Sequence, residues 1–260
     1  METVFPSQLL NLLSGLRQQL DQVRGELDRV HSATTQPFHT LTANLQKALE
    51  AERGKRQALE QTLYETLLRV ATALDYRDRR SSDRLTRLSQ YTMLLALQFG
   101  LPEAEVQLLY SATPLYDLGK IGIPDAVLLK PGRLEEVERT IVEIHPTLGT
   151  SLLSGADSPL LDQARQIALT HHEHWDGSGY PQGLKGEDIP LGGRLVILAE
   201  QYEVLRSTRP HKPAFDHARA CHILFNGDER TRPAHFDPRL LEAFRVIHGD
   251  FAAIYDRRTI

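Results

Sequence analysis

Hydrophobic residues recur at alternating intervals of four and three along the first part of the chain. They are Leu9, Leu13, Leu16, Leu20, Val23, Leu27 and Val30. Polar and charged residues fill most positions between them, so the apolar residues form the a/d stripe of a heptad repeat. A mean spacing of about 3.5 residues favours a two-stranded coiled coil, and hence a homodimer through these helices. A single amphipathic helix packed on its own domain is the alternative.

Pro37 is expected to interrupt this helix near residues 35–40, because proline lacks an N–H and disfavours a helical conformation at Gln36. A second helix is expected from about Leu41. Its apolar stripe resumes at Leu59, Leu63, Leu67, Val70 and Leu74. We therefore expect a helical dimerisation region over residues 1–66, running without a loop into a second domain over residues 67–260. The first region would either transmit a signal or act only as a dimerisation handle.

From Leu67 onward, helical patterns are separated by short segments rich in glycine and proline. Examples are Phe99–Pro102 and Lys130–Gly132. No stretch shows the sustained alternation of apolar and polar residues that is typical of a strand. The pattern predicts an all-α fold.

Composition narrows the class of protein further. The 260 residues carry a formal charge of −4, which gives no sign of the basic surface that binds a nucleic-acid polymer. Cys221 is the only cysteine, so no internal disulfide can form and a reducing cytoplasm fits. The longest apolar run, Met93–Leu101, is too short to span a membrane. We expect a cytoplasmic protein without a membrane span.

Candidate chemistry is concentrated in the segment HHEHWDGSGYPQGLKGEDIP, from His171 to Pro190. It places two adjacent histidines ahead of a turn that contains Gly179, Tyr180 and Pro181. Imidazole is the commonest transition-metal ligand, so the segment indicates a metal beside a pocket. Three ordinary surface or core histidines, including His145, would be the alternative.

This segment, together with DLGKIGIPD (Asp117–Asp125) and Glu143-Ile144-His145-Pro146, resembles the HD-GYP family over roughly Leu67–Phe244. Members of that family are bacterial metal-dependent phosphodiesterases that degrade cyclic di-GMP on an HD-domain-like helical bundle. The resemblance implies that Asp117, His145, His171 and His172 hold a divalent transition metal, either Fe, Mn or Zn. The family's late aspartate corresponds to Glu200, a weaker candidate ligand.

The sequence departs from the family at two further ligand positions. The family's His-Asp pair is Tyr116-Asp117 here, and Arg84 stands where the family has another histidine. Arginine cannot ligate a cation, because its guanidinium stays protonated, and a tyrosine hydroxyl titrates near about 10. Arg84 would repel a second metal or take its place beside Asp117. We expect one metal per chain, where active relatives hold two or three.

Residues that the resemblance assigns to the ligand are better retained. Lys120 matches a lysine that reaches a phosphate, and with Asp117 it belongs to the family's catalytic residues. Tyr180 matches a residue that contacts the nucleotide, and Arg209 and Lys212 match a basic pair that follows the late acid. Arginine and lysine suit phosphodiesters. The expected ligand is cyclic di-GMP or a related dinucleotide.

Three hypotheses remain. The first is a one-metal HD-GYP protein, weakly active or inactive, that acts as a nucleotide-binding module or binds a signalling protein. The second is an active phosphodiesterase with an unusual site. The third is a scaffold without metal or nucleotide. The missing ligands at Arg84 and Tyr116 favour the first.

Overall fold

The computed structural model describes residues 5–78, 81, 83–155, 158–208 and 214–257. The chain divides into two compact units, Met1–Tyr64 and Glu65–Ile260. The described residues form helices and turns without a strand, so the predicted all-α class is confirmed.

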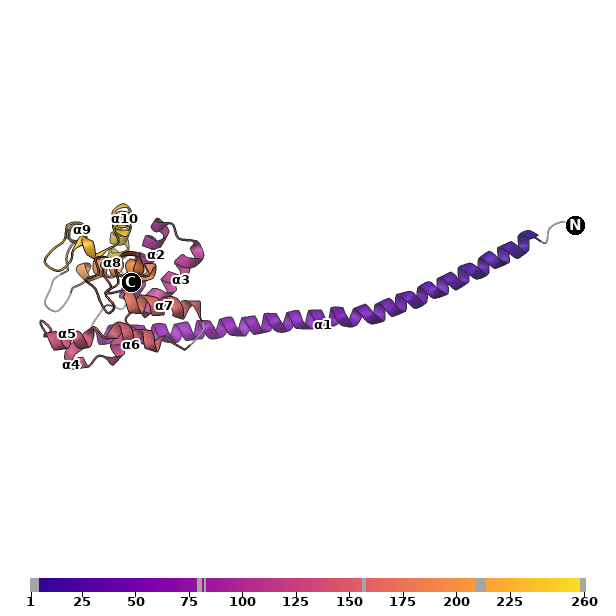
Figure 1. The fold of residues 1–260 in the computed structure, drawn as a ribbon, viewed down its shortest axis with the longest axis horizontal. Helices are drawn as coiled ribbons and strands as arrows, with labels where there is room; N and C mark the ends of the chain where they lie inside the picture. Colours follow the sequence, from indigo (N-terminus) through magenta and orange to yellow (C-terminus); the bar gives the residue numbers. More distant parts are fainter. Residues whose placement is uncertain (1–4, 79–80, 82, 156–157, 209–213, 258–260) are drawn as a thin grey trace. The chain divides into compact units, whose positions relative to one another are not determined.

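Helix α1 spans Phe5–Arg77 (Figure 1). Its residues up to Tyr64 make up the described part of the first unit, and its remaining residues belong to the second unit. Pro37 lies inside this helix, so the predicted interruption at residues 35–40 was wrong. Proline removes one backbone hydrogen bond at a cost of about 3 kcal/mol. Long runs of good helix formers on both sides, rich in leucine, glutamine and glutamate, outweigh a single such loss.

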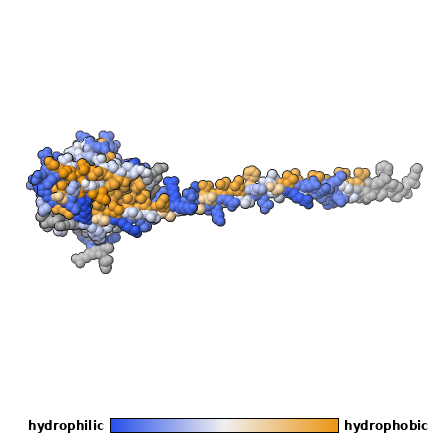
Figure 2. Space-filling model, turned by 90° about the horizontal axis from the view of Figure 1, so that it is seen from below, coloured by the Kyte–Doolittle hydropathy of each residue, from blue (hydrophilic) through white to orange (hydrophobic). Residues whose placement is uncertain are grey.

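The apolar stripe of α1 is exposed in this single chain. Leu20, Val23 and Leu27 are each more than 60% accessible. Figure 2 shows a row of hydrophobic residues along one side of the helix, above a hydrophilic side. An exposed apolar stripe of this length is typical of a helix that associates with another.

The second unit is a bundle of shorter helices. Its α-helices are α2 (Arg84–Phe99), α3 (Glu103–Ala112), α4 (Asp125–Leu128), α5 (Glu136–Val142), α6 (His145–Leu152), α7 (Pro159–Thr170), α8 (Leu191–Arg206), α9 (His217–Asn226) and α10 (Pro238–Asp256). Within the described residues, four 3₁₀ turns lie between them: η1 (Thr113–Leu115), η2 (Leu118–Gly122), η3 (Gly186–Asp188) and η4 (Pro233–His235).

The core of this unit lies where α2 packs on α3, α8 and α10, and α7 packs on α3, α6 and α8. Leu88, Leu95 and Leu195 are fully buried there, and the ring of Tyr91 stacks on Phe251 with centroids 4.4 Å apart. A packed core of this kind holds the helix ends rigidly, and the candidate site is built on such ends. Among the described residues, no helix is both long and apolar enough to cross a membrane.

Candidate metal centre

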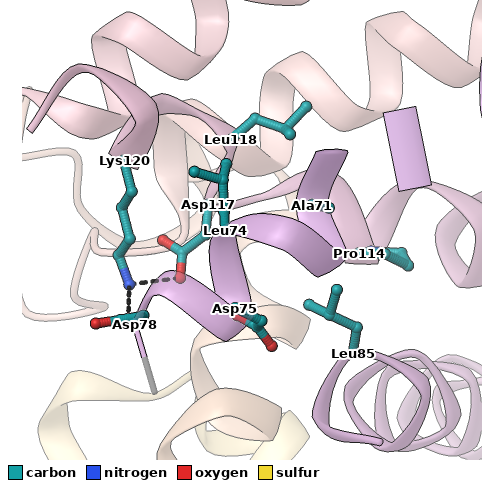
Figure 3. Close-up of a pocket in the computed structure, with 9 residues that line it drawn as sticks. All are labelled: Ala71, Leu74, Asp75, Asp78, Leu85, Pro114, Asp117, Leu118 and Lys120. Carbon is teal, nitrogen blue, oxygen red and sulfur yellow. Dashed lines mark hydrogen bonds and ion pairs between the residues drawn. The ribbon is translucent and has the colours of Figure 1, made fainter. Parts of the chain in front are cut away.

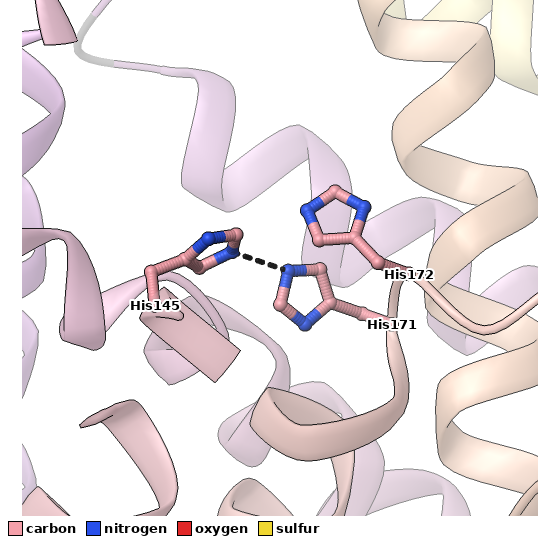
Figure 4. A group of neighbouring side chains, drawn as sticks. All are labelled: His145, His171 and His172. Atoms are coloured by element: carbon pink, nitrogen blue, oxygen red, sulfur yellow. Dashed lines mark hydrogen bonds between the residues drawn. The ribbon is translucent and has the colours of Figure 1, made fainter. Parts of the chain in front are cut away.

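Four of the predicted ligands come from three separate elements and meet at one point. Asp117 directly precedes η2, His145 is the first residue of α6, and His171 and His172 follow the end of α7. Figure 4 shows the three imidazoles turned toward one another. Gly119 allows η2 to approach α6, because a Cβ there would lie 1.9 Å from the carbonyl oxygen of His145.

The distances between these groups match a shared metal. His145 Nε2 lies 3.2 Å from His171 Nε2 and 3.3 Å from Asp117 Oδ1, and His171 Nε2 lies 3.7 Å from the same oxygen. Nitrogens bound to one tetrahedral metal at about 2.0–2.1 Å are separated by roughly 3.3–3.4 Å. One nitrogen of His172 lies within 4.8 Å of one from each of the other two histidines.

The hydrogen bonds around these rings favour metal binding. His145 Nδ1–H donates to the Val142 carbonyl at 2.7 Å, and His171 Nδ1–H donates to the Ala168 carbonyl at 2.9 Å. In the neutral rings both Nε2 atoms therefore carry lone pairs that face each other. Among the described residues, Asp117 Oδ1 is a buried oxygen beside them without a hydrogen-bond donor. Two lone pairs and a carboxylate oxygen directed at one point fit a cation.

The charge states also suit a metal. Burial would raise the pKa of Asp117, but the charge of Lys120 holds it well below its ordinary value. Burial and the two neighbouring imidazoles lower the pKa of His172 well below the usual value for histidine. The carboxylate is thus charged and the His172 ring neutral near pH 7, as ligands of a transition metal must be.

Arg84 occupies the other side of Asp117. Its Nη1 lies 3.1 Å from Asp75 Oδ1, and its Nη2 lies 3.1 Å from Glu200 Oε1 and 4.0 Å from Asp117 Oδ2. Nη2 also donates to the Tyr116 hydroxyl, which in turn donates to Glu200 Oε1 at 2.9 Å. The guanidinium is 3% exposed. The structure therefore places a fixed positive charge among three carboxylates, two of them at predicted metal-ligand positions.

Glu200 and Tyr116 are bound into this arginine network. One oxygen of Glu200 accepts from both Arg84 and Tyr116, and Glu200 does not belong to the histidine cluster. The Tyr116 ring meets His171 edge-on, with centroids 4.9 Å apart, and separates the histidines from Glu200. The predicted ligands thus fall into two groups, the cluster around Asp117 and the carboxylates paired with Arg84.

Lys120 lies beside Asp117 and is itself buried. Its Nζ donates to Asp117 Oδ2 at 2.7 Å and to Asp78 Oδ2 at 3.3 Å (Figure 3). Both acids line the same small pocket, as does Asp75. An ammonium has three N–H donors, so Lys120 suits a phosphate oxygen as a further acceptor.

The loop that contains Tyr180 covers His172. The two rings stack with centroids 4.6 Å apart, so Tyr180 is an aromatic surface directly beside the histidine cluster. Arg209 and Lys212, the other predicted ligand-binding residues, lie outside the described residues.

Glu173 holds this loop in place by hydrogen bonds to its backbone. Its carboxylate is 1% exposed and accepts the backbone N–H groups of Gln182 at 2.7 Å and Leu184 at 2.9 Å. Sequence reasoning used Glu173 only as the acid of the His-His-Glu sequence that indicated a metal, and it assigned no role to Asp75 or Asp78. A signal existed for Asp75, since it is a charged residue within the apolar stripe that contains Leu74.

Replacing Glu173 with alanine should lower the free energy of unfolding by about 2–4 kcal/mol, because two buried N–H groups lose a charged acceptor. Glu173→Gln keeps one acceptor oxygen and should lose about half as much. Denaturant unfolding measures both. Glu187→Ala is the matched control, because its ion pair with Arg239 is exposed. Equal effects of Glu173→Ala and Glu187→Ala would contradict the stabilising role of the Glu173 hydrogen bonds.

His174, which follows Glu173 in the chain, should make the stability of the folded protein sensitive to acid. Burial and the stacked ring of His235 lower the pKa of His174 to about 4. The unfolded chain, with a pKa near 6.5, binds more protons between these values, so stability falls as the pH drops from about 6.5 to 4. His174→Gln should remove up to about 3 kcal/mol of that fall. Denaturant unfolding at pH 7 and pH 4 measures the stability that each protein loses between these values. An equal loss in His174→Gln and in the unmutated protein would contradict the prediction.

Residues 69–240 match the family model of the HD domain. The chain is 44% identical over 201 residues to the cyclic di-GMP phosphodiesterase response regulator RpfG of Xanthomonas campestris, covering 76% of this chain and 52% of the relative. It is 39% identical over 227 residues to a cyclic di-GMP phosphodiesterase of Vibrio cholerae, covering 82% and 45%. The chain spans about half the length of these relatives.

A solved structure supports the same fold. The cyclic GMP-AMP specific phosphodiesterase V-cGAP3 of Vibrio cholerae superposes with a TM-score of 0.52 at 21% identity, covering 76% of this chain and 51% of that one. HD-domain phosphodiesterases are metal-dependent, which agrees with the cluster of His145, His171 and His172. Together the matches and the fold show that this chain belongs to the HD domain family and, within it, to the HD-GYP proteins.

Proposed function

We propose that this is a one-metal HD-GYP protein whose phosphodiesterase activity is lost or strongly weakened, and which acts as a nucleotide-binding or protein-interaction module. The position of Arg84 carries the proposal. Its guanidinium lies between Asp75 and Glu200 and 4.0 Å from Asp117 Oδ2, where relatives with two metals need a second cation.

The retained half of the site supports one metal. Asp117, His145, His171 and His172 would hold it, and their mixed imidazole and carboxylate set suits Fe, Mn or Zn. When bound, such a metal supplies Lewis-acid polarisation and a more acidic water. Arg84 supplies positive charge but has no coordination position. A water therefore cannot bridge Arg84 and that metal as it bridges two metals.

The effect on rate follows from the missing second cation. Two metals clamp both the attacking and the leaving oxygen of a phosphodiester. If that clamp contributes about 5 kcal/mol to the transition state, its loss reduces the rate by roughly 10³–10⁴-fold. Lys120 keeps its role of neutralising a phosphate, which favours binding but does not replace the clamp.

Nucleotide binding is the function that these residues retain best. Lys120 offers a donor beside Asp117, and Tyr180 offers a ring face beside His172 on which a base can stack. The relatives named above are cyclic di-GMP phosphodiesterases. We propose cyclic di-GMP or a related dinucleotide as the ligand, with Arg209 and Lys212 as further phosphate contacts.

The exposed stripe of α1 supports a homodimer that could present this domain to a signalling partner in the cytoplasm. Leu20→Glu combined with Leu27→Glu should convert the dimer to a monomer, because both side chains would lie in a coiled-coil seam. Light scattering measures the mass. Gln22→Glu, on the polar side of the helix, is the control and should remain dimeric. A monomeric unmutated protein would contradict the proposal.

Product analysis tests the function. The protein is purified anaerobically, reconstituted with Fe(II) or Mn(II) and incubated with cyclic di-GMP, with Asp117→Ala as the control. We expect a melting temperature raised by metal and by nucleotide, with little or no linear product. Product formed by the unmutated protein but not by Asp117→Ala would establish the second hypothesis, an active enzyme with an unusual site. Absence of any thermal shift would establish a scaffold instead.

A further inference from the structure

A second group of metal-ligating side chains lies between α9 and α10. His217 and Cys221 are one turn apart on α9, and His248 faces them from α10. One ligand atom from each lies within 4.8 Å of the others. The group shares no residue with the centre around Asp117, and it is the one place in the described chain where a thiol joins two imidazoles.

The spacing of these atoms matches a zinc ion. His217 Nε2 lies 2.9 Å from His248 Nδ1 and 3.6 Å from Cys221 Sγ. Tetrahedral zinc, with bonds of about 2.0–2.1 Å to nitrogen and about 2.3 Å to sulfur, separates two nitrogens by roughly 3.3–3.4 Å and nitrogen from sulfur by roughly 3.6 Å. The sulfur is already at that distance from Nε2, but it also lies 3.7 Å from Nδ1, so the His217 ring must turn for Nε2 and Sγ to face one cation. The two nitrogens need to part by a few tenths of an ångström.

A buried hydroxyl supports the ring that both other ligands touch. The Tyr202 hydroxyl lies 2.9 Å from His217 Nδ1 and accepts a hydrogen bond from Arg206 at 2.8 Å. When His217 Nδ1–H donates to this oxygen, Nε2 keeps its lone pair for a cation. Such an outer partner fixes the tautomer and orientation of a metal-bound histidine. Asp256 lies 2.8 Å from Arg206 and offsets its charge.

We propose that His217, Cys221 and His248 form a second metal site that binds Zn²⁺ or a similar borderline-soft divalent cation. Three protein ligands leave a fourth position for water or an added ligand. A cation there fixes α9 to α10. The thiolate distinguishes this site from the Asp117 centre, whose nitrogen and oxygen ligands suit harder metals.

Cobalt titration of the chelator-treated full chain tests the proposal. Cobalt(II) replaces zinc in such sites, and a thiolate ligand gives a sulfur-to-cobalt charge-transfer band that nitrogen and oxygen ligands cannot give. Cys221 is the only cysteine, so the band reports on this site alone. We expect the band to saturate by two cobalt ions per chain, one for each centre, and to disappear when two equivalents of zinc are added.

One ligand variant, one outer-partner variant and one control test the site. His248→Gln should weaken cobalt binding at the band by about 100-fold or more, and Tyr202→Phe should weaken it by about 10–100-fold as an outer partner. His222→Gln is the control, because His222 is exposed on the same helix, and should bind as the unmutated protein does. Circular dichroism checks that each variant is folded.

Two results would overturn the site. Cobalt bound without a charge-transfer band would mean that Tyr202, His217 and His248 form only a hydrogen-bonded chain. A band of unchanged affinity in His248→Gln would remove the third ligand and leave no three-residue site. Neither result bears on nucleotide hydrolysis, which the Asp117 centre governs.

Discussion

Replacing Arg84 with methionine should lower the free energy of unfolding by about 3–5 kcal/mol. The guanidinium is 3% exposed and pairs with Asp75 and Glu200, so its removal takes a buried cation away from both carboxylates. Breaking a buried ion pair by removing one partner typically costs that much. Denaturant unfolding of metal-free protein measures the change, because added metal would itself stabilise the folded state.

An exposed arginine provides the matched comparison. Arg165 pairs with Asp162 at 2.5 Å, but both side chains are more than a third exposed. Arg165→Met should therefore change the free energy of unfolding by about 0.5 kcal/mol or less. An effect of Arg84→Met as small as that of Arg165→Met would show that Arg84 does not substitute for a cation.

Restoring the family's ligands should create a phosphodiesterase. In the triple variant Arg84→His, Tyr116→His and Glu200→Asp, the internal cation is replaced by groups that can ligate a second metal next to Asp117. We expect turnover of cyclic di-GMP to increase by about 10³-fold or more, because the two-metal clamp is regained. Product analysis with Fe(II) or Mn(II) measures the gain.

Two controls make this result specific. Adding Asp117→Ala to the triple variant should abolish the gain, because Asp117 lies between the two halves of the site. Arg84→His alone should gain much less, since Tyr116 still occupies the neighbouring position. A folded triple variant that binds two metals but has the activity of the unmutated chain would show that Arg84 is not what limits catalysis.

Much of the fold could be predicted because each feature depends on local pattern. Apolar periodicity indicated helices, and glycine and proline marked their ends. The interruption predicted at Pro37 was wrong because helix formation is cooperative. The long helix-forming runs on both sides determine whether the helix continues, and the preference of one residue does not.

The candidate site divides in the same way. Asp117, His145, His171 and His172 belong to motifs, so a family resemblance could bring them together. In the structure the three histidines form one group, and Asp117 Oδ1 lies 3.3 Å from His145 Nε2. The supporting groups depend on tertiary contacts. Asp75 binds Arg84, Asp78 binds Lys120, and Glu173 holds backbone groups nine and eleven residues away.

The cluster of His217, Cys221 and His248 could not be predicted for a similar reason. His217 and Cys221 share one face of a helix, but a pair of candidate ligands is a weak signal by itself. Only the packing of α10 on α9 supplies the third ligand and the Tyr202 hydroxyl behind it. No local pattern in the sequence specifies that packing.

The most direct test of the central claim is an anomalous difference map from crystals of the full chain loaded with Mn(II). Manganese suits nitrogen and oxygen ligands, so it reports on the Asp117 centre rather than on the thiol site. We predict one peak bounded by Asp117, His145, His171 and His172, with Arg84 still paired to Asp75 and Glu200. A second peak beside Asp117, with the Arg84 guanidinium displaced, would contradict the one-metal assignment.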